Sequence, residues 1–296
     1  MSLAPTPLAH TPYDGSATPF AIGLKPLDLA GWLEIDALHA PYLAEKRRLF
    51  AERPADVFAE EAGTREAQRE ALDLVAGWLE THAPHLPRLG EQAGDPPLKT
   101  ASLMVQEDLV LMRRGDDGWR LAAASLCFPS SWSLAEKFGR SLRDIHIPVP
   151  GFGPGTRNDT VIGRIFDNLA VDRPVERSNW SLQDDPALYH PLSDRERDTR
   201  AAARPARFDA GDPVAAAFIR VERQTLRRLP GSGDVLFTIR IHLDPMAALR
   251  QHPDRARLAA PFAGQLAAFD AGQMAYKGLS ADRDRLVAAL RALGTA

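Results

Sequence analysis

Two turn sequences, each set between runs of apolar residues, constrain the fold of this chain more than any other feature. The first is Gly115-Asp116-Asp117-Gly118, which separates the apolar run of residues 102–113 from that of residues 119–128. The second, Pro230-Gly231-Ser232-Gly233-Asp234, stands between two similar runs. Apolar runs joined by Asp/Gly turns are typical of β-hairpins. We therefore expect a sheet that is mostly antiparallel.

The predicted elements form an α+β chain in which helices precede, interrupt and follow this sheet. Five strands are predicted, at residues 102–113, 119–128, 175–183, 215–223 and 235–243. The spacing of apolar residues predicts helices within 26–50, 65–82, 133–144 and 253–293. Grouped strands and flanking helices favour α+β over an alternating β/α fold.

The domain organisation follows from the same pattern. Residues 1–20 are rich in proline and lack periodicity, which predicts an extended arm. Residues 21–296 are expected to form a single domain, with a helical N-terminal part over 21–98 and a helical C-terminal part over 250–296.

Composition excludes several classes of function. The net charge of −3 and the pI near 6.3 provide no basic field for nucleic acid. No apolar run approaches the ~20 residues of a membrane helix, and the first residues do not resemble a secretory signal, so a cytoplasmic location is expected. The single cysteine, Cys127, excludes an internal disulfide and a multi-cysteine iron–sulfur site. We find no Walker A loop, no dinucleotide fingerprint and no Gly-x-Ser-x-Gly motif.

Several short blocks carry unusual residues, and together they resemble one family. They are Leu126-Cys127-Phe128-Pro129-Ser130 with Trp132, the Ile-His-x-Pro-Val-Pro-Gly stretch at 145–151, Asn179-Trp180, Glu222-Arg223-Gln224-Thr225-Leu226 with Leu229-Pro230, Phe237-Thr238-Ile239-Arg240, and Tyr276-Lys277-Gly278-Leu279. In this order the blocks resemble the haem-dependent oxidative N-demethylase family, over roughly residues 20–280.

The resemblance implies a fold, a cofactor and partners. The fold would be a PAS-like antiparallel sheet of five strands that holds haem b. The reaction would be oxidative N-demethylation of a small secondary amine, such as dimethylamine, with dioxygen. Electrons would come from NADPH through a separate flavin and iron–sulfur reductase. That reductase must be another polypeptide, because this chain lacks the cysteines for a cluster.

Haem iron needs an axial donor, and His146 is the candidate we favour. It lies in a proline-rich loop after a predicted helix, and neutral imidazole is a common haem ligand. The alternative is a structural histidine that bonds backbone carbonyls in a proline-rich turn. Cys127 is a rival, although a cysteine in an apolar strand usually packs as a small hydrophobe. His242, on another predicted strand, is a further rival.

Other charged and aromatic residues are candidates for the haem propionates and the amine. Lys137, Arg140 and Arg223 could bind propionates, although the first two could equally be surface charges. Neighbouring strand residues face opposite sides, so either Glu222 or Arg223 should point inward. An inward Glu222 would bind an alkylammonium ion, whereas a structural ion pair between charged residues remains the alternative. Trp180 could wall the amine pocket through a cation–π contact or could be a core residue.

Two alternatives to an enzyme stay open from the sequence. A PAS-like haem or small-ligand sensor could share the fold without turnover, because fold does not define function. A copy that has lost haem could act as a subunit of an amine-catabolic complex. Residues Tyr276 and Lys277 could close the site, an expectation that rests on the resemblance alone.

Overall fold

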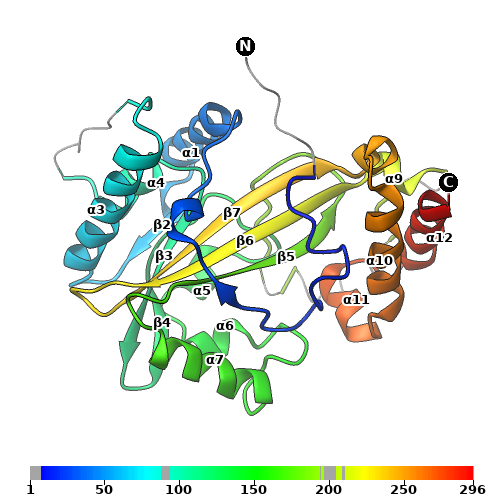
Figure 1. The fold of residues 1–296 in the computed structure, drawn as a ribbon. Coiled ribbons are helices and arrows are strands. Elements are labelled where there is room, and N and C mark those ends of the chain that lie inside the picture. Colours follow the sequence, from blue (N-terminus) through cyan, green and yellow to red (C-terminus); the bar gives the residue numbers. More distant parts are fainter. Residues whose placement is uncertain (1–7, 88–93, 194, 197–204, 209–210, 296) are drawn as a thin grey trace.

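The computed structural model describes residues 8–87, 94–193, 195–196, 205–208 and 211–295. Its centre is a seven-stranded sheet in the order β1-β5-β6-β7-β3-β4-β2, in which every pairing is antiparallel (Figure 1). The strands are β1 Lys25–Pro26, β2 Phe58–Glu60, β3 Asp108–Gly115, β4 Gly118–Ser125, β5 Val175–Gln183, β6 Phe218–Arg228 and β7 Val235–Pro245.

The predicted α+β class is confirmed, but the number of strands was wrong. The five predicted strands correspond to β3 to β7, and β5 has the predicted bounds. The prediction missed the two edge strands, β1 and β2, which have two and three residues. Strands this short show no alternation in the sequence, since a period of two needs several residues to be visible. A PAS-like arrangement of five strands therefore does not describe the whole sheet.

The helices surround the sheet and its connections. They are α1 His39–Glu52, α2 Pro54–Val57, α3 Arg65–His82, α4 Pro97–Ser102, α5 Leu134–Lys137, α6 Leu142–Ile145, α7 Arg157–Asn168, α9 Pro213–Ala216, α10 Arg255–Ala268, α11 Ala271–Lys277 and α12 Arg283–Thr295, with 3-10 helices η1 Leu29–Gly31 and η2 Met246–Gln251. Among the described residues, no helix combines the length and the apolar character needed to cross a bilayer.

Three helix predictions need correction. The helix expected within 26–50 begins only at His39. The helix expected over 133–144 is two single turns, α5 and α6, because Gly139 between them has a φ of +74°. Helix α7 was not predicted, although Thr156 caps it by accepting a hydrogen bond from the N–H of Asp159.

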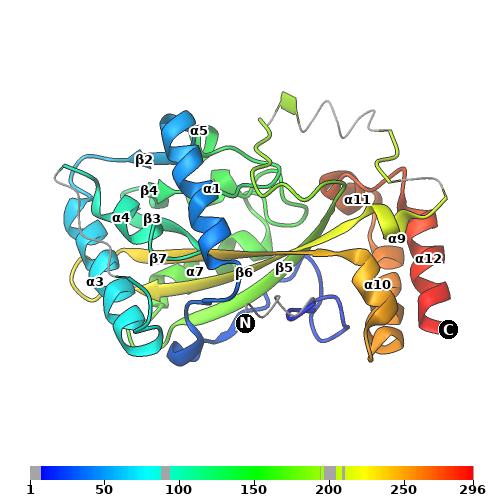
Figure 2. The same ribbon diagram turned by 90° about the horizontal axis from the view of Figure 1, so that it is seen from above.

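The strands place their side chains in different cores on the two faces of the sheet. In β3, Val110 and Met112 join the core that also holds Phe166 of α7, whereas Leu109 and Leu111 join the core beneath α3 and α4. At the other end, Trp180 of β5 packs into the core formed with α10 and α12. Helices α5, α6 and α7 thus cover one face, as Figures 1 and 2 show.

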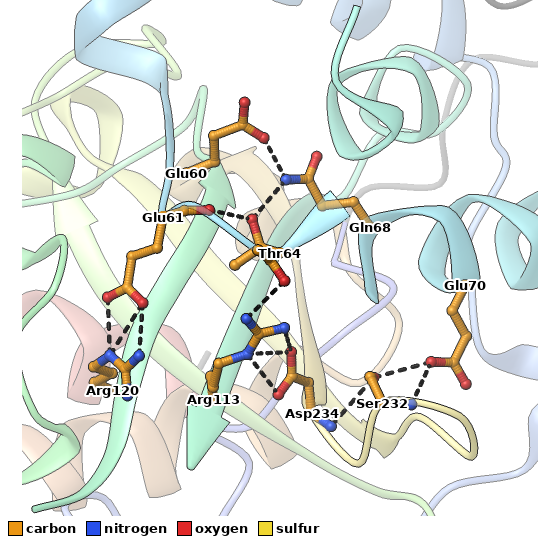
Figure 3. A network of polar contacts seen from close by, with 10 residues as sticks. Glu60, Glu61, Thr64, Gln68, Glu70, Arg113, Arg120, Ser232 and Asp234 are labelled. Atoms are coloured by element: carbon orange, nitrogen blue, oxygen red, sulfur yellow. Dashed lines mark hydrogen bonds and ion pairs between the residues drawn. The ribbon is translucent and has the colours of Figure 1, made fainter. Parts of the chain in front are cut away.

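A polar network fixes the end of the sheet where the hairpins turn (Figure 3). Arg113 of β3 donates to both carboxylate oxygens of Asp234, which precedes β7, at 2.7 to 3.1 Å. Glu70 of α3 accepts hydrogen bonds from the backbone N–H groups of Gly231 and Ser232 in the same turn. Bidentate arginine–carboxylate contacts fix orientation as well as distance. The network therefore holds the β6–β7 turn against α3.

The N-terminal segment lies along the C-terminal helices (Figure 2). Tyr13 is fully buried and stacks on Phe262 of α10, with ring centroids 4.4 Å apart. Residues 8–20 contain no helix or strand, and most of them lie in turns and bends. They are packed on the protein, and residues 1–7 lie outside the described part.

Candidate functional site

A cleft of about 270 Å³ lies between the sheet and the short helices that cover it, and it opens to solvent. The sheet supplies one wall, which includes Val110, Met112, Leu226, Phe237 and Ile239. The opposite wall comes from the loop after α6 and from α7, and includes Val149, Phe152, Ile162 and Phe166. The cleft therefore offers a flat apolar ligand two apolar walls.

Among the described residues, polar side chains line this cleft at several positions besides the indole of Trp132. They are Ser131, Lys137, His146, Arg177, Asn179, Glu222, Gln224, Tyr276 and Lys277. Few convergent polar groups in a mainly apolar cleft are typical of small-molecule and cofactor sites.

His146 follows the last residue of α6 and turns its ring toward the cleft. Its Nδ1 lies 2.7 Å from the carbonyl oxygen of Leu142. Because a carbonyl only accepts, Nδ1 carries the proton and Nε2 keeps its lone pair. Burial lowers the pKa of His146, with the Leu142 carbonyl opposing it, so the ring is neutral at pH 7. Phe152 stacks beside the ring, with centroids 6.1 Å apart. The site thus contains one oriented, neutral imidazole donor.

Arg177 brings a buried guanidinium to the same cleft from β5. Its Nε is buried and has no hydrogen-bond partner among the described residues. Burial lowers the pKa of Arg177, and the nearby Glu222 carboxylate opposes this shift. A buried donor without a partner costs free energy, which a bound anion would recover.

Glu222 faces the cleft from β6, directly opposite Asn179 of β5. Gln224 donates to its carboxylate from Nε2 at 3.2 Å. Lys277, at the end of α11, borders the same region and lies over the rings of Phe20 and Trp180. Burial lowers the pKa of Lys277 to about 8, although Glu222 opposes the shift. The cleft therefore has one carboxylate among cationic groups.

The structure brings His146, Lys137 and Glu222 together at the cleft, but not the other predicted site residues. Arg223 lies on the opposite face of the sheet, where its Nε donates to Glu176 at 2.8 Å. Arg140 is exposed and does not line the cleft. Trp180 lies on the far face, in the α10–α12 core, and donates to Gln265 at 2.9 Å.

The two rival axial ligands are also placed elsewhere. Cys127 is completely buried outside the cleft, and burial, reinforced by Asp108, raises the pKa of its thiol far above the usual range. A protonated, enclosed thiol is a poor metal ligand. His242 lies on the other face of the sheet, 2.7 Å from Glu34. Neither residue reaches the cleft that holds His146.

Sequence reasoning missed Arg177. The signal was present, because Arg177 and Asn179 are two residues apart in a predicted strand and must share a face. Asn179 belongs to one of the blocks that carry the family resemblance, so its partner at i−2 was a candidate for the same site.

An apolar cleft with one neutral imidazole and a buried guanidinium has the features typical of a cofactor site, here in a protein of the α+β class. A comparison with family models gives a match over residues 23–287, to the family described as haem-dependent oxidative N-demethylase, alpha subunit-like. This chain belongs to that family. The description specifies an oxidoreductase that depends on haem, and a subunit that works with a partner subunit.

The residues at the cleft fit a haem. Apolar side chains on both walls suit the faces of a porphyrin, and the free Nε2 of His146 suits an axial position. The unpartnered Nε of Arg177 suits a propionate. Metal-binding histidines usually donate a hydrogen bond from their second ring nitrogen to a carbonyl or carboxylate, as His146 does from Nδ1 to Leu142.

Proposed function

We propose that this chain is the haem-carrying subunit of an oxidative N-demethylase that acts on a small secondary amine with dioxygen. The observation that carries the proposal is His146, whose Nδ1 is fixed by the Leu142 carbonyl so that Nε2 is free at an apolar cleft. Haem b, when bound, supplies the redox chemistry that activates dioxygen. The chain would supply the iron ligand, the pocket and the charges around it.

His146 would hold the iron through Nε2, and two cationic residues would hold the propionates. Lys137 of α5 is almost fully buried at the cleft, and Arg177 brings a guanidinium whose Nε lacks a partner among the described residues. Charge-assisted hydrogen bonds to carboxylates are about twice as strong as neutral ones. These two cations also offset the charge of the propionates in a region of low polarity.

Glu222 would bind the amine. A secondary alkylamine is protonated at neutral pH, and Glu222 offers a carboxylate oxygen to its N–H groups. Asn179, directly opposite on β5, limits the directions from which the amine can approach. The carboxylate can hold the proton that the ammonium ion gives up when the neutral amine forms. A dimethylamine-like substrate suits this role because it combines one charge with two small methyl groups.

Electrons would reach the haem from a separate NADPH-dependent flavin and iron–sulfur reductase. The chain has one cysteine, which is free and buried, so it cannot bind an iron–sulfur cluster itself. A cytoplasmic location agrees with a free cysteine.

The test begins with absorption spectra of the purified protein and two variants. We expect a Soret band in the wild type, and a lost or altered band in His146→Ala. The matched control is His39→Ala, since His39 also contacts a backbone carbonyl, that of Met104, but lies outside the cleft. An unchanged ferrous spectrum in His146→Ala would exclude this ligand.

Turnover is tested separately, with the haem-loaded protein and a chemical reductant. We expect dioxygen uptake that depends on dimethylamine and yields formaldehyde. Haem binding without amine-dependent uptake would instead indicate a haem sensor or binding protein.

A further inference from the structure

Three potential metal ligands from distant parts of the sequence meet on the face of the sheet opposite the cleft. They are His10 of the N-terminal segment, Glu34 between η1 and α1, and His242 of β7. One ligand atom from each lies within 4.8 Å of the other two. None of the three lines the haem cleft described above.

The two imidazoles point at the same carboxylate, one at each oxygen. His10 Nε2 lies 2.9 Å from Glu34 Oε1, and His242 Nε2 lies 2.7 Å from Glu34 Oε2. The two rings lie next to each other, with centroids 4.2 Å apart. This is the donor set of two imidazole nitrogens and one carboxylate that divalent transition metals prefer.

The surroundings hold these donors in place. The backbone N–H of Glu34 donates to Glu107 at 2.9 Å, which fixes the chain at this point. His242 lies on β7, where it is paired with Val221 of β6. The three side chains are 14 to 28% exposed, so the cluster is sheltered but can be reached from solvent.

The local charges permit a cation. Arg223 lies 3.8 Å from Glu34, but its charge is already paired with Glu176. Asp244 shares the strand face of His242 and adds a second carboxylate in the neighbourhood of His10. A divalent ion would replace the contacts between each imidazole and Glu34 with shorter bonds of about 2.0 to 2.2 Å.

We propose that His10, Glu34 and His242 form a second metal site, separate from the haem, that takes a divalent transition ion of the Zn²⁺ type. The ion would join the N-terminal segment to the central sheet, since its ligands come from both. Zinc accepts three protein ligands and leaves a fourth position for water. Because the three ligands lie outside the haem cleft and come from distant segments, we assign the ion a stabilising role and do not expect it to take part in the reaction at the cleft.

The test is a titration of the chelator-treated full chain with Zn²⁺, followed by calorimetry and by metal analysis after dialysis. We expect one Zn²⁺ to bind in addition to the haem iron, and the melting temperature to rise with Zn²⁺. His10→Ala and His242→Ala should each weaken binding beyond the roughly 10- to 100-fold loss seen when a supporting residue around a metal is removed. His82→Ala is the matched control, because His82 is exposed on α3 and belongs to no such cluster.

A further variant tests the metal site with a substitution that should not disturb folding. Glu34→Gln keeps the size and a hydrogen-bonding oxygen but removes the charge, so it should fold and still bind Zn²⁺ more weakly. The Soret band serves as an independent check of the fold in each variant. The proposal is overturned if the wild type binds no Zn²⁺, or if folded His10→Ala, Glu34→Gln and His242→Ala proteins bind it like the wild type. In either case His10, Glu34 and His242 form only a hydrogen-bonded cluster and not a metal site.

Discussion

Glu222 and Arg223 are consecutive residues of β6, and their side chains lie on opposite faces of the sheet. Glu222 borders the cleft with Asn179, whereas Arg223 binds Glu176 and the carbonyl oxygens of Gly31 and Trp32. Glu222 therefore lines the cleft, and Arg223 is held by contacts within the fold. This division leads to two predictions with different readouts.

Glu222→Gln should weaken the binding of the amine without loss of haem. A hydrogen bond to a charged group contributes about 1.5 to 3 kcal/mol, so we expect KM for dimethylamine to rise roughly 10- to 150-fold. The measurement is amine-dependent dioxygen uptake, with haem content read from the Soret band. The control is Glu70→Gln, which removes a charge that lies outside the cleft. An unchanged KM would remove Glu222 from the amine site.

Arg223→Met should destabilise the fold and leave haem affinity unchanged in the folded protein. The substitution leaves the carboxylate of Glu176 without this partner at a mostly buried position, where breaking an ion pair costs about 3 kcal/mol. Urea unfolding measures the stability, and haem titration measures the affinity. The exposed Arg47 of α1 provides the control, Arg47→Met. A stable variant with weakened haem binding would contradict the placement of Arg223.

Lys277 should make stability depend on pH. Its folded pKa is about 8, against 10.5 for the unfolded chain, because burial disfavours the charged form. Between these values the unfolded chain binds more protons, so the free energy of unfolding should rise as the pH increases from 8 to 10.5. Below pH 8 Lys277 is protonated in both the folded and the unfolded chain. The folded protein then retains the full free-energy cost of burying the charged amine. The free energy of unfolding should increase by at most about 3 kcal/mol, since one pKa unit corresponds to about 1.4 kcal/mol and the side chain is only partly buried.

The check for Lys277 is the difference between the wild type and Lys277→Met in urea unfolding at several pH values. The difference should change across this window and stay constant below it. A difference that is the same at pH 7 and pH 10 would show that the lysine is not desolvated in the folded protein.

Cys127→Ala should leave the haem spectrum unchanged. The thiol is buried outside the cleft, and its raised pKa keeps it protonated. Removing the sulfur should cost about 1 kcal/mol of stability through lost packing. The measurement is the spectrum of the ferrous carbon monoxide complex, in which a thiolate ligand would be evident. A spectral change in this variant, with none in His146→Ala, would reverse the ligand assignment.

The amino-acid sequence predicts those elements whose residues interact with their neighbours in the chain. The hairpin at residues 115–118, strand β5 and helix α3 were all found where local spacing predicted them. Helix α7 was missed although its signal was present, since Val161, Ile162, Ile165 and Phe166 stand at helical spacing after the cap at Thr156. The helix packs Phe166 under the sheet. The break at Gly139 depends on a positive φ that the sequence permits but does not require.

The candidate site was likewise decided partly by the sequence and partly by the tertiary structure. The sequence, through its resemblance to the family, predicted His146 as the favoured ligand, and it showed that Glu222 and Arg223 must point in opposite directions, because the pleat of a strand alternates its side chains. Which of the two faces the cleft was decided only by the helices that cover each side of the sheet. The tertiary structure also decided that His10, Glu34 and His242 meet, since His242 is more than 200 positions from the other two in the chain and no local interaction joins it to them.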